Sequence, residues 1–131
     1  MLKPSVGVFA AILLFVISST AFGQKTSRIT FAKGATSKVV TGSLTDYKGH
    51  LSFVVRVNKG QTLTTESIGK NRIIVEVRPP GNTDFEPHME ADCLDKYDVY
   101  PTVEGEYIIN VYECQKADPW KGTFKLRVRV R

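Results

Sequence analysis

The amino-acid sequence predicts an all-β protein, a single small antiparallel β-sandwich or jelly roll of about eight strands. Apolar and polar residues alternate along most of the chain, and a period of two places successive side chains on opposite faces of a strand. No window sustains the apolar stripe of an amphipathic helix. Turn residues recur at regular spacing between these short segments, as in sandwiches and jelly rolls.

In the first half of the chain, strands are expected at residues 29–31, 39–40, 51–57, 63–68 and 73–77. Gly42 is interpreted as a turn after the second of these. The pair Lys59-Gly60 breaks the apolar alternation as a hairpin turn would. Pro79-Pro80-Gly81 ends the strand at 73–77, because proline has no N–H to give to a sheet.

The second half begins with residues 81–96, which show no clear period and are expected to form a long loop that carries at most a short strand. A short strand at 97–99 and a turn at Glu104-Gly105 follow. Strong alternation then predicts strands at 107–111 and 124–130, separated by a polar loop. Residues 24–131 are enough for one domain with a single core, and they contain no internal repeats.

The first 23 residues have the pattern of a secretory signal peptide. Lys3 precedes an uncharged apolar run at 6–17, and Ala21-Phe22-Gly23 offers the small residues of a cleavage site. A membrane anchor is the competing interpretation, but the run is shorter than the roughly 20 apolar residues that span a bilayer. We therefore expect cleavage before Gln24, a mature domain of residues 24–131 without a membrane anchor, and a periplasmic or secreted location.

Cys93 and Cys114 are the two cysteines of the chain, and both lie in the expected mature part. An even number of cysteines in an oxidising compartment predicts a disulfide bond. The alternative is a pair of buried free thiols.

Charge is distributed in blocks along the sequence. Residues 25–78 carry ten basic and three acidic side chains, residues 79–115 carry one lysine against nine acidic side chains, and residues 116–131 are again basic. Two interpretations stay open: an electrostatically polar molecule that steers toward a charged partner, or an acidic segment that folds against the basic strands and cancels their field.

Catalytic motifs are absent from the sequence. His50 and His88 are the two histidines, and no serine or cysteine has the context of an activated nucleophile. His88, Glu90 and Asp92 alternate and would share one face of a strand, but a solvated acidic loop is the favoured interpretation of that segment. The sequence thus predicts a non-enzymatic protein with no catalytic residues, no metal site and no cofactor.

The last predicted strand carries a basic stripe, formed by Lys125, Arg127, Arg129 and Arg131. Basic grooves with nearby aromatic residues bind single-stranded nucleic acid. Cations on an edge strand instead prevent edge-to-edge aggregation. Because the chain is expected to be exported, the protective interpretation is favoured and nucleic acid is not expected as a partner.

Two aromatic residues fall in predicted turns or loops, Tyr47 between Asp46 and Lys48 and Trp120 between Pro119 and Lys121. Loops on a rigid sandwich commonly carry recognition, and aromatic side chains there supply contact area at low entropic cost. For Trp120 the alternative is that it covers one end of the core.

Several short motifs together resemble the periplasmic inhibitors of goose-type (g-type) lysozyme; they lie at residues 29–34, 41–44, 46–47, 53, 58–61 and 105–107. The Gly60-Gln61 turn, Pro80-Gly81 and Gly105-Glu106-Tyr107 are also similar to bacterial pre-peptidase C-terminal domains. Both families imply a β-sandwich. The first implies an inhibitor and the second a binding module for polysaccharide or protein.

The inhibitor resemblance implies that loops at one end of the sandwich enter the substrate cleft of a lysozyme, with the g-type favoured. Tyr47 matches a family position in that surface. The family presents arginines from the loop before the last strand, whereas residues 114–121 contain Lys116 and Lys121 and no arginine. The expected partner-binding residues are therefore Tyr47, Lys116, Trp120 and Lys121. The alternative is a non-catalytic module that binds a cell-wall or extracellular polysaccharide or a protein.

Overall fold

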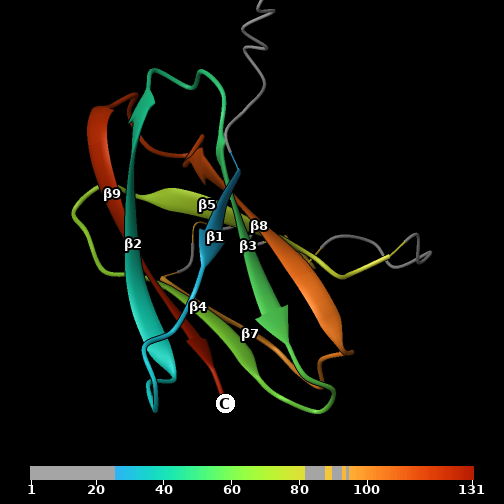
Figure 1. Cartoon of the computed structure of the whole chain (residues 1–131). Helices are drawn as coiled ribbons and strands as arrows, with labels where there is room; N and C mark the ends of the chain where they lie inside the picture. The colour runs from blue at the N-terminus through green and yellow to red at the C-terminus, as the bar shows by residue number, and fades with distance from the viewer. Residues whose placement is uncertain (1–25, 82–87, 90–92, 94) are drawn as a thin grey trace, which may run out of the picture.

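The computed structural model describes residues 26–81, 88–89, 93 and 95–131. The expected signal peptide and most of the acidic loop lie outside these ranges. The described residues form a β-sandwich of two sheets (Figure 1). One sheet has the strand order β1 (Thr26–Ile29), β3 (Leu51–Val57), β8 (Gly105–Glu113), β5 (Ile73–Arg78) and β6 (His88–Met89). The other has the order β2 (Ser37–Thr45), β9 (Lys121–Val130), β4 (Leu63–Ser67) and β7 (Lys96–Val99).

All of these strands pair antiparallel except β1, which runs parallel to β3. The prediction of a small antiparallel β-sandwich is thus confirmed, with β1 and β3 as a parallel pair that the sequence did not predict. The two-residue strand β6 pairs with β5 through Met89 and His88, so the long loop after Gly81 does carry a short strand. Among the described residues there is no helix with the length and hydropathy needed to cross a membrane.

The core lies between the two sheets and follows from the alternation in the sequence. In β3, Phe53, Val55 and Val57 are buried, and β5, β8 and β9 each contribute alternate residues in the same way. Phe53 and Phe124 meet edge to face across the sheets, with ring centroids 6.3 Å apart, a favoured geometry for aromatic pairs.

The turn expected at Gly42 is wrong. Strand β2 continues through Gly42, which pairs with Phe124 of β9. A Cβ at this position would lie 2.2 Å from Cδ1 of Leu51 and 2.8 Å from Cε1 of Phe124. The glycine therefore permits close approach of large side chains inside a strand, and the chain turns only after Thr45.

Lys59-Gly60 does break the strand, but the expected hairpin is also wrong, because β3 and β4 belong to different sheets. The connection is a corner between the sheets, held by the buried residue Thr102. Its N–H donates to Gln61 O at 3.0 Å and its hydroxyl donates to Asn58 O at 2.7 Å.

Strand β9 lies in the middle of its sheet, between β2 and β4 (Figure 1). The prediction that its cations protect a sheet edge is therefore wrong, since both sides of β9 are already paired. The basic stripe needs a different explanation.

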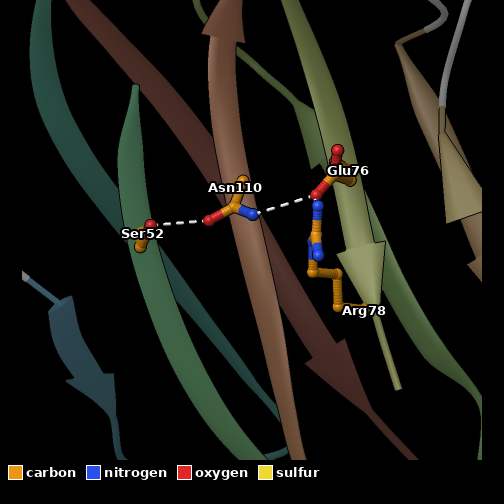
Figure 2. A network of polar contacts seen from close by, with 4 residues as sticks. All are labelled: Ser52, Glu76, Arg78 and Asn110. Atoms are coloured by element: carbon orange, nitrogen blue, oxygen red, sulfur yellow. Dashed lines mark hydrogen bonds and ion pairs between the residues drawn. The ribbon is translucent and has the colours of Figure 1, made fainter. Parts of the chain in front are cut away.

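A row of polar side chains crosses the outer face of the other sheet (Figure 2). Ser52 of β3 donates to Asn110 Oδ1 at 2.6 Å, and Asn110 Nδ2 on β8 donates to Glu76 Oε1 on β5 at 3.1 Å. Arg78 forms an ion pair with Glu76, and this contact raises the pKa of Arg78. Ser52, Asn110 and Glu76 are all buried. Because buried polar groups are costly without partners, this row fixes the register of the three strands.

The predicted disulfide between Cys93 and Cys114 is present, with its Cα atoms 5.8 Å apart. Cys114 follows directly after β8, so the bond anchors the acidic loop at the end of that strand.

Candidate partner-binding site

The chain between β2 and β3 begins with an unusual tight turn at one end of the sandwich (top of Figure 1). Lys48 N–H donates to Thr45 O at 2.8 Å, and the two central residues, Asp46 and Tyr47, have φ values of 45° and 63°. Positive φ at both central positions defines a type I′ turn, where glycine, asparagine or aspartate is usual. A tyrosine in this conformation is strained, and such outliers persist where the surroundings hold them.

Glu113 holds the strained turn in place. Its carboxylate accepts a hydrogen bond from the N–H of Tyr47 at Oε2 (2.7 Å) and from the N–H of Trp120 at Oε1 (2.5 Å). The side chain of Glu113 is buried, which makes these charge-assisted bonds stronger than exposed ones. One carboxylate thus ties the β2–β3 turn to the β8–β9 loop.

Two further hydrogen bonds join these segments. The Tyr47 hydroxyl donates to the carbonyl oxygen of Ala117, and the N–H of Asp46 donates to the carbonyl oxygen of Trp120 at 3.0 Å. The phenol ring of Tyr47 therefore lies along the β8–β9 loop, yet 40% of the residue stays exposed. Tyr47 is both anchored and accessible.

The phenol of Tyr47 is held in its protonated form. Desolvation against the loop raises its pKa, and the negative charges of Glu113 and Asp118 raise it further. A neutral phenol is what a hydrogen bond to the Ala117 carbonyl requires, since the hydroxyl must donate.

Trp120 is partly buried and packs against the core. Its indole Nε1 donates to the carbonyl oxygen of Arg72 at 3.1 Å, in addition to the backbone bond to Glu113. The structure therefore gives Trp120 the covering position that the sequence left open as its alternative role. The residue is not fully covered and stays partly exposed.

Both predicted lysines lie beside Tyr47. Lys116 precedes Ala117, which accepts the Tyr47 hydroxyl bond, and Lys121 pairs with Thr45 at the base of the turn. Both lysines are exposed. The structure thus brings all four residues predicted from the sequence to one end of the sandwich, where β2 and β8 end and β9 begins.

Sequence reasoning missed two residues of this site, Glu113 and Arg72. Glu113 continues the inward series of β8, in which Tyr107, Ile109 and Val111 are buried. A carboxylate at an inward position of a strand is the sequence signal for such a residue, because a buried carboxylate needs hydrogen-bond donors around it. Arg72 lies in the β4–β5 connection and left no sequence signal; its carbonyl also accepts the N–H of Cys114 at 3.0 Å.

The β8–β9 loop contains no arginine. Arg72, from the β4–β5 connection, places a guanidinium at the same end of the sandwich as this loop. The side chain is exposed, and Nη2 donates to the carbonyl oxygen of Cys93 at 3.3 Å. Arg72, Lys116 and Lys121 bring three cations to this end, where the acidic side chains of Asp46, Glu113 and Asp118 also lie.

No group of three or more metal-ligating side chains occurs among the residues that the structure describes. Glu90 and Asp92, which the sequence placed in one alternating series with His88, lie outside those residues.

The fold has counterparts among solved structures. No family model matches the sequence, and no curated protein matches it. The structure of PliG from Aeromonas hydrophila, a periplasmic lysozyme inhibitor of g-type lysozyme, superposes with a TM-score of 0.65 and 24% sequence identity over 81% of this chain and 96% of that chain. PliG from Salmonella Typhimurium gives a TM-score of 0.62 with 16% identity, over 82% of this chain and 98% of that chain.

A pre-peptidase C-terminal domain of collagenase from Bacillus anthracis is also similar, with a TM-score of 0.54 and 12% identity over 83% of this chain and 97% of that chain. Both resemblances noted in the sequence thus reappear in three dimensions. The chain has the β-sandwich fold that periplasmic inhibitors of g-type lysozyme share with a pre-peptidase C-terminal domain.

Proposed function

We propose that the chain is a periplasmic or secreted protein inhibitor of lysozyme, with g-type lysozyme as the favoured partner. One observation carries the proposal. On a fold shared with PliG inhibitors, Glu113 holds an exposed tyrosine in a strained turn at the end of the sandwich, and Lys116 and Lys121 lie on the segments next to that turn.

The chemistry of this end is complementary to a lysozyme cleft. Glycosidases of this kind work with carboxylates that flank the scissile bond, so their clefts present negative charge. Tyr47 offers a rigid aromatic surface with a polar tip. Lys116, Lys121 and Arg72 add positive charge that speeds encounter with an acidic cleft.

Rigidity of the site favours binding as well. The Tyr47 turn and the β8–β9 loop are joined to each other and to Glu113 before any partner arrives. Little conformational entropy is then lost when a partner binds, which is the general advantage of a preorganised interface. In this account Tyr47 enters the cleft, while Trp120 supports the turn and contributes the accessible part of its ring.

Lysine and arginine are not equivalent in such a site. Lysine gives a point charge, whereas arginine gives a planar fork that binds a carboxylate through two parallel hydrogen bonds. Arg72 supplies a fork from the β4–β5 connection, where its Nη2 donates to the carbonyl oxygen of Cys93. Inhibition by this chain therefore relies on Tyr47 and Arg72 for directional contacts and on the two lysines for attraction.

The proposed location follows from the expected signal peptide and agrees with a disulfide, which forms in oxidising compartments. Export is tested by intact-mass measurement of the protein recovered from periplasm and medium. Loss of residues 1–23 supports the proposal. Full-length protein retained in the membrane fraction contradicts it.

The function is tested by a lysis assay in which the purified protein is added to g-type, invertebrate-type and chicken-type lysozymes acting on cell-wall substrate. Inhibition of the g-type enzyme supports the proposal. If the protein inhibits only another type of lysozyme, that type is the partner in place of the g-type enzyme. If no lysozyme is inhibited, the alternative takes its place: a module that binds polysaccharide or protein without inhibiting an enzyme.

A further inference from the structure

We infer that the outer face of the β2–β9 pair is a second binding surface, one that takes a linear anionic polysaccharide. The outward positions of β9 are Lys121, Thr123, Lys125, Arg127 and Arg129. The intervening residues, such as Phe124 and Leu126, are buried in the core. Four cations therefore lie along one line on the outside of the sandwich.

The position of β9 makes this line unusual. A central strand needs no cations to prevent edge pairing, so the charges have no protective role there. They also have few acidic partners. Arg127 contacts Glu66 at 3.5 Å, whereas no ion pair joins Lys121, Lys125 or Arg129 to a carboxylate among the described residues. Like charges on neighbouring outward positions repel one another, and a bound polyanion would relieve that repulsion.

Hydroxyl groups run beside the cations on the neighbouring strand. The register between β2 and β9 places Thr45 opposite Lys121, Ser43 opposite Thr123, Thr41 opposite Lys125 and Ser37 opposite Arg129. Cations bind the anionic groups of a chain molecule, and hydroxyls bind both anionic oxygens and sugar hydroxyls. The face thus offers the two kinds of contact that an acidic polysaccharide needs along its length.

A hollow of about 410 Å³ adjoins this line on the side of the β4–β5 connection. Lys125 and Lys70 both line it, and the other lining residues are Ile68, Gly69, Asn71 and Thr123. Asn71 Nδ2 donates to the carbonyl oxygen of Thr123 at 2.8 Å, which holds this rim against β9. The hollow gives one residue of a bound polysaccharide a recess between two ammonium groups.

Other polyanions fit the face less well. Nucleic acid binding without base pairing relies on aromatic side chains for stacking, and no outward position of β2 or β9 is aromatic. Protein interfaces have an apolar centre with aromatic anchors, whereas the apolar contribution of β2 to the middle of this face is one exposed valine, Val39, opposite Arg127. Outward positions on a strand repeat every 7 Å or so, and the line from Lys121 to Arg129 extends about 27 Å, which requires an extended ligand.

The test uses the purified, disulfide-bonded protein and five probes. Heparin oligosaccharides present sulfate, polygalacturonate presents carboxylate, and neutral dextran is the control. Single-stranded DNA and anionic phosphatidylglycerol vesicles are the competing polyanions. Binding is measured by calorimetry at several salt concentrations. We expect one or both anionic probes to bind with an affinity that falls steeply as salt rises, because charged contacts release counterions. Dextran should not bind. The anionic probe that binds more tightly identifies the anionic group.

The decisive variant is the pair Lys125→Gln and Arg129→Gln, which removes two cations that form no ion pair with the described part of the chain. It should weaken binding about tenfold or more and flatten the salt dependence. The matched control is the pair Arg28→Gln and Arg56→Gln on the opposite sheet, where both arginines pair with glutamates at the surface. This control lowers the net charge by the same two units as the Lys125 and Arg129 pair. If binding depends on local contacts at the β2–β9 face, affinity for the polysaccharide should stay within about twofold of the parent.

Lys121 is left unchanged in these variants because it also belongs to the candidate lysozyme-binding end. Lysozyme inhibition should therefore be the same in both pairs. The proposal is overturned if neither anionic polysaccharide binds, if both variant pairs lose affinity equally, or if single-stranded DNA or anionic phosphatidylglycerol vesicles bind more tightly than either polysaccharide at the same salt concentration.

Discussion

The carboxylate of Glu113 lies 2.7 Å from the backbone nitrogen of Tyr47, although 66 residues separate the two in the chain. The same carboxylate accepts the N–H of Trp120. A buried acid therefore positions two segments, and the exposed tyrosine is fixed by its backbone as well as by its hydroxyl. This arrangement separates the residue that supports the site from the residue that would contact a partner.

Replacing Glu113 by Gln tests the supporting role. The amide can accept from one of the two N–H groups, but its own NH₂ group faces the other. We expect the free energy of unfolding to fall by about 2–3 kcal/mol, as for loss of a hydrogen bond to a buried charged group. Chemical denaturation measures this change. Glu106→Gln is the control, because its surface ion pair with Arg28 is exposed and should contribute less than about 1 kcal/mol. Equal effects of the two changes would contradict the anchoring role.

The positive φ of Tyr47 predicts that two truncations differ in stability. Tyr47→Ala and Tyr47→Gly both remove the phenol, but only alanine keeps a Cβ in the left-handed conformation. The glycine variant should therefore be more stable than the alanine variant by about 1 kcal/mol. Thermal and chemical unfolding of the two proteins give the difference. If alanine is the more stable replacement, the turn is not strained at this residue.

Alkaline pH should weaken the link between Tyr47 and the β8–β9 loop. The pKa of Tyr47 is raised in the folded protein, so its stabilising contribution is complete below the ordinary tyrosine pKa of about 10 and is lost as the pH rises through the raised value. The difference in unfolding free energy between the parent and Tyr47→Phe should therefore shrink above about pH 10. Tyr112 also has a raised pKa, but it is present in both proteins and cancels. A difference that stays constant across this range would contradict the prediction.

The disulfide joins Cys93 to the residue that follows Glu113. Replacing both cysteines by serine should lower the free energy of unfolding by about 2–5 kcal/mol. Because Cys114 begins the β8–β9 loop, loss of the disulfide should also weaken lysozyme inhibition. This weakening should be seen even at temperatures where the variant is fully folded, so that unfolding does not explain it. Unfolding curves and lysis assays on the same samples separate the two effects. Full inhibition by the folded variant would show that the bond does not position the loop.

The strands of the core could be predicted from the sequence because burial on one face imposes a period of two. Residues 51–57 form a strand with the predicted bounds, and Phe53, Val55 and Val57 face the core as expected. Strand order could not be predicted, since alternation is the same in a central and an edge strand. This is why the basic strand β9 was assigned to an edge. Gly42 was misread because a glycine that permits close packing looks in sequence like a glycine in a turn.

The candidate site could be predicted in part for similar reasons. Tyr47 and Trp120 stand out as aromatic residues in polar, turn-rich segments, and those segments do meet in the structure. Their link through Glu113 depends on contacts across 66 residues of sequence, which no local pattern encodes. Arg72 reaches the site for the same reason, through the packing of β5 against β8.

The central claim is that the Tyr47 end of the sandwich binds a lysozyme. The most direct measurement is the dissociation constant for g-type lysozyme of the parent, of Tyr47→Ala and of Tyr100→Ala. Tyr100 is the matched control: a tyrosine, 72% exposed, that follows β7 at the opposite end of the sandwich. Loss of a central aromatic contact should weaken binding by about 2 kcal/mol, or roughly thirtyfold. Tyr47→Ala should show that weakening, and Tyr100→Ala should keep the affinity of the parent. Parent-like binding by Tyr47→Ala together with weakened binding by Tyr100→Ala would contradict the account and move the interface to the other end of the molecule.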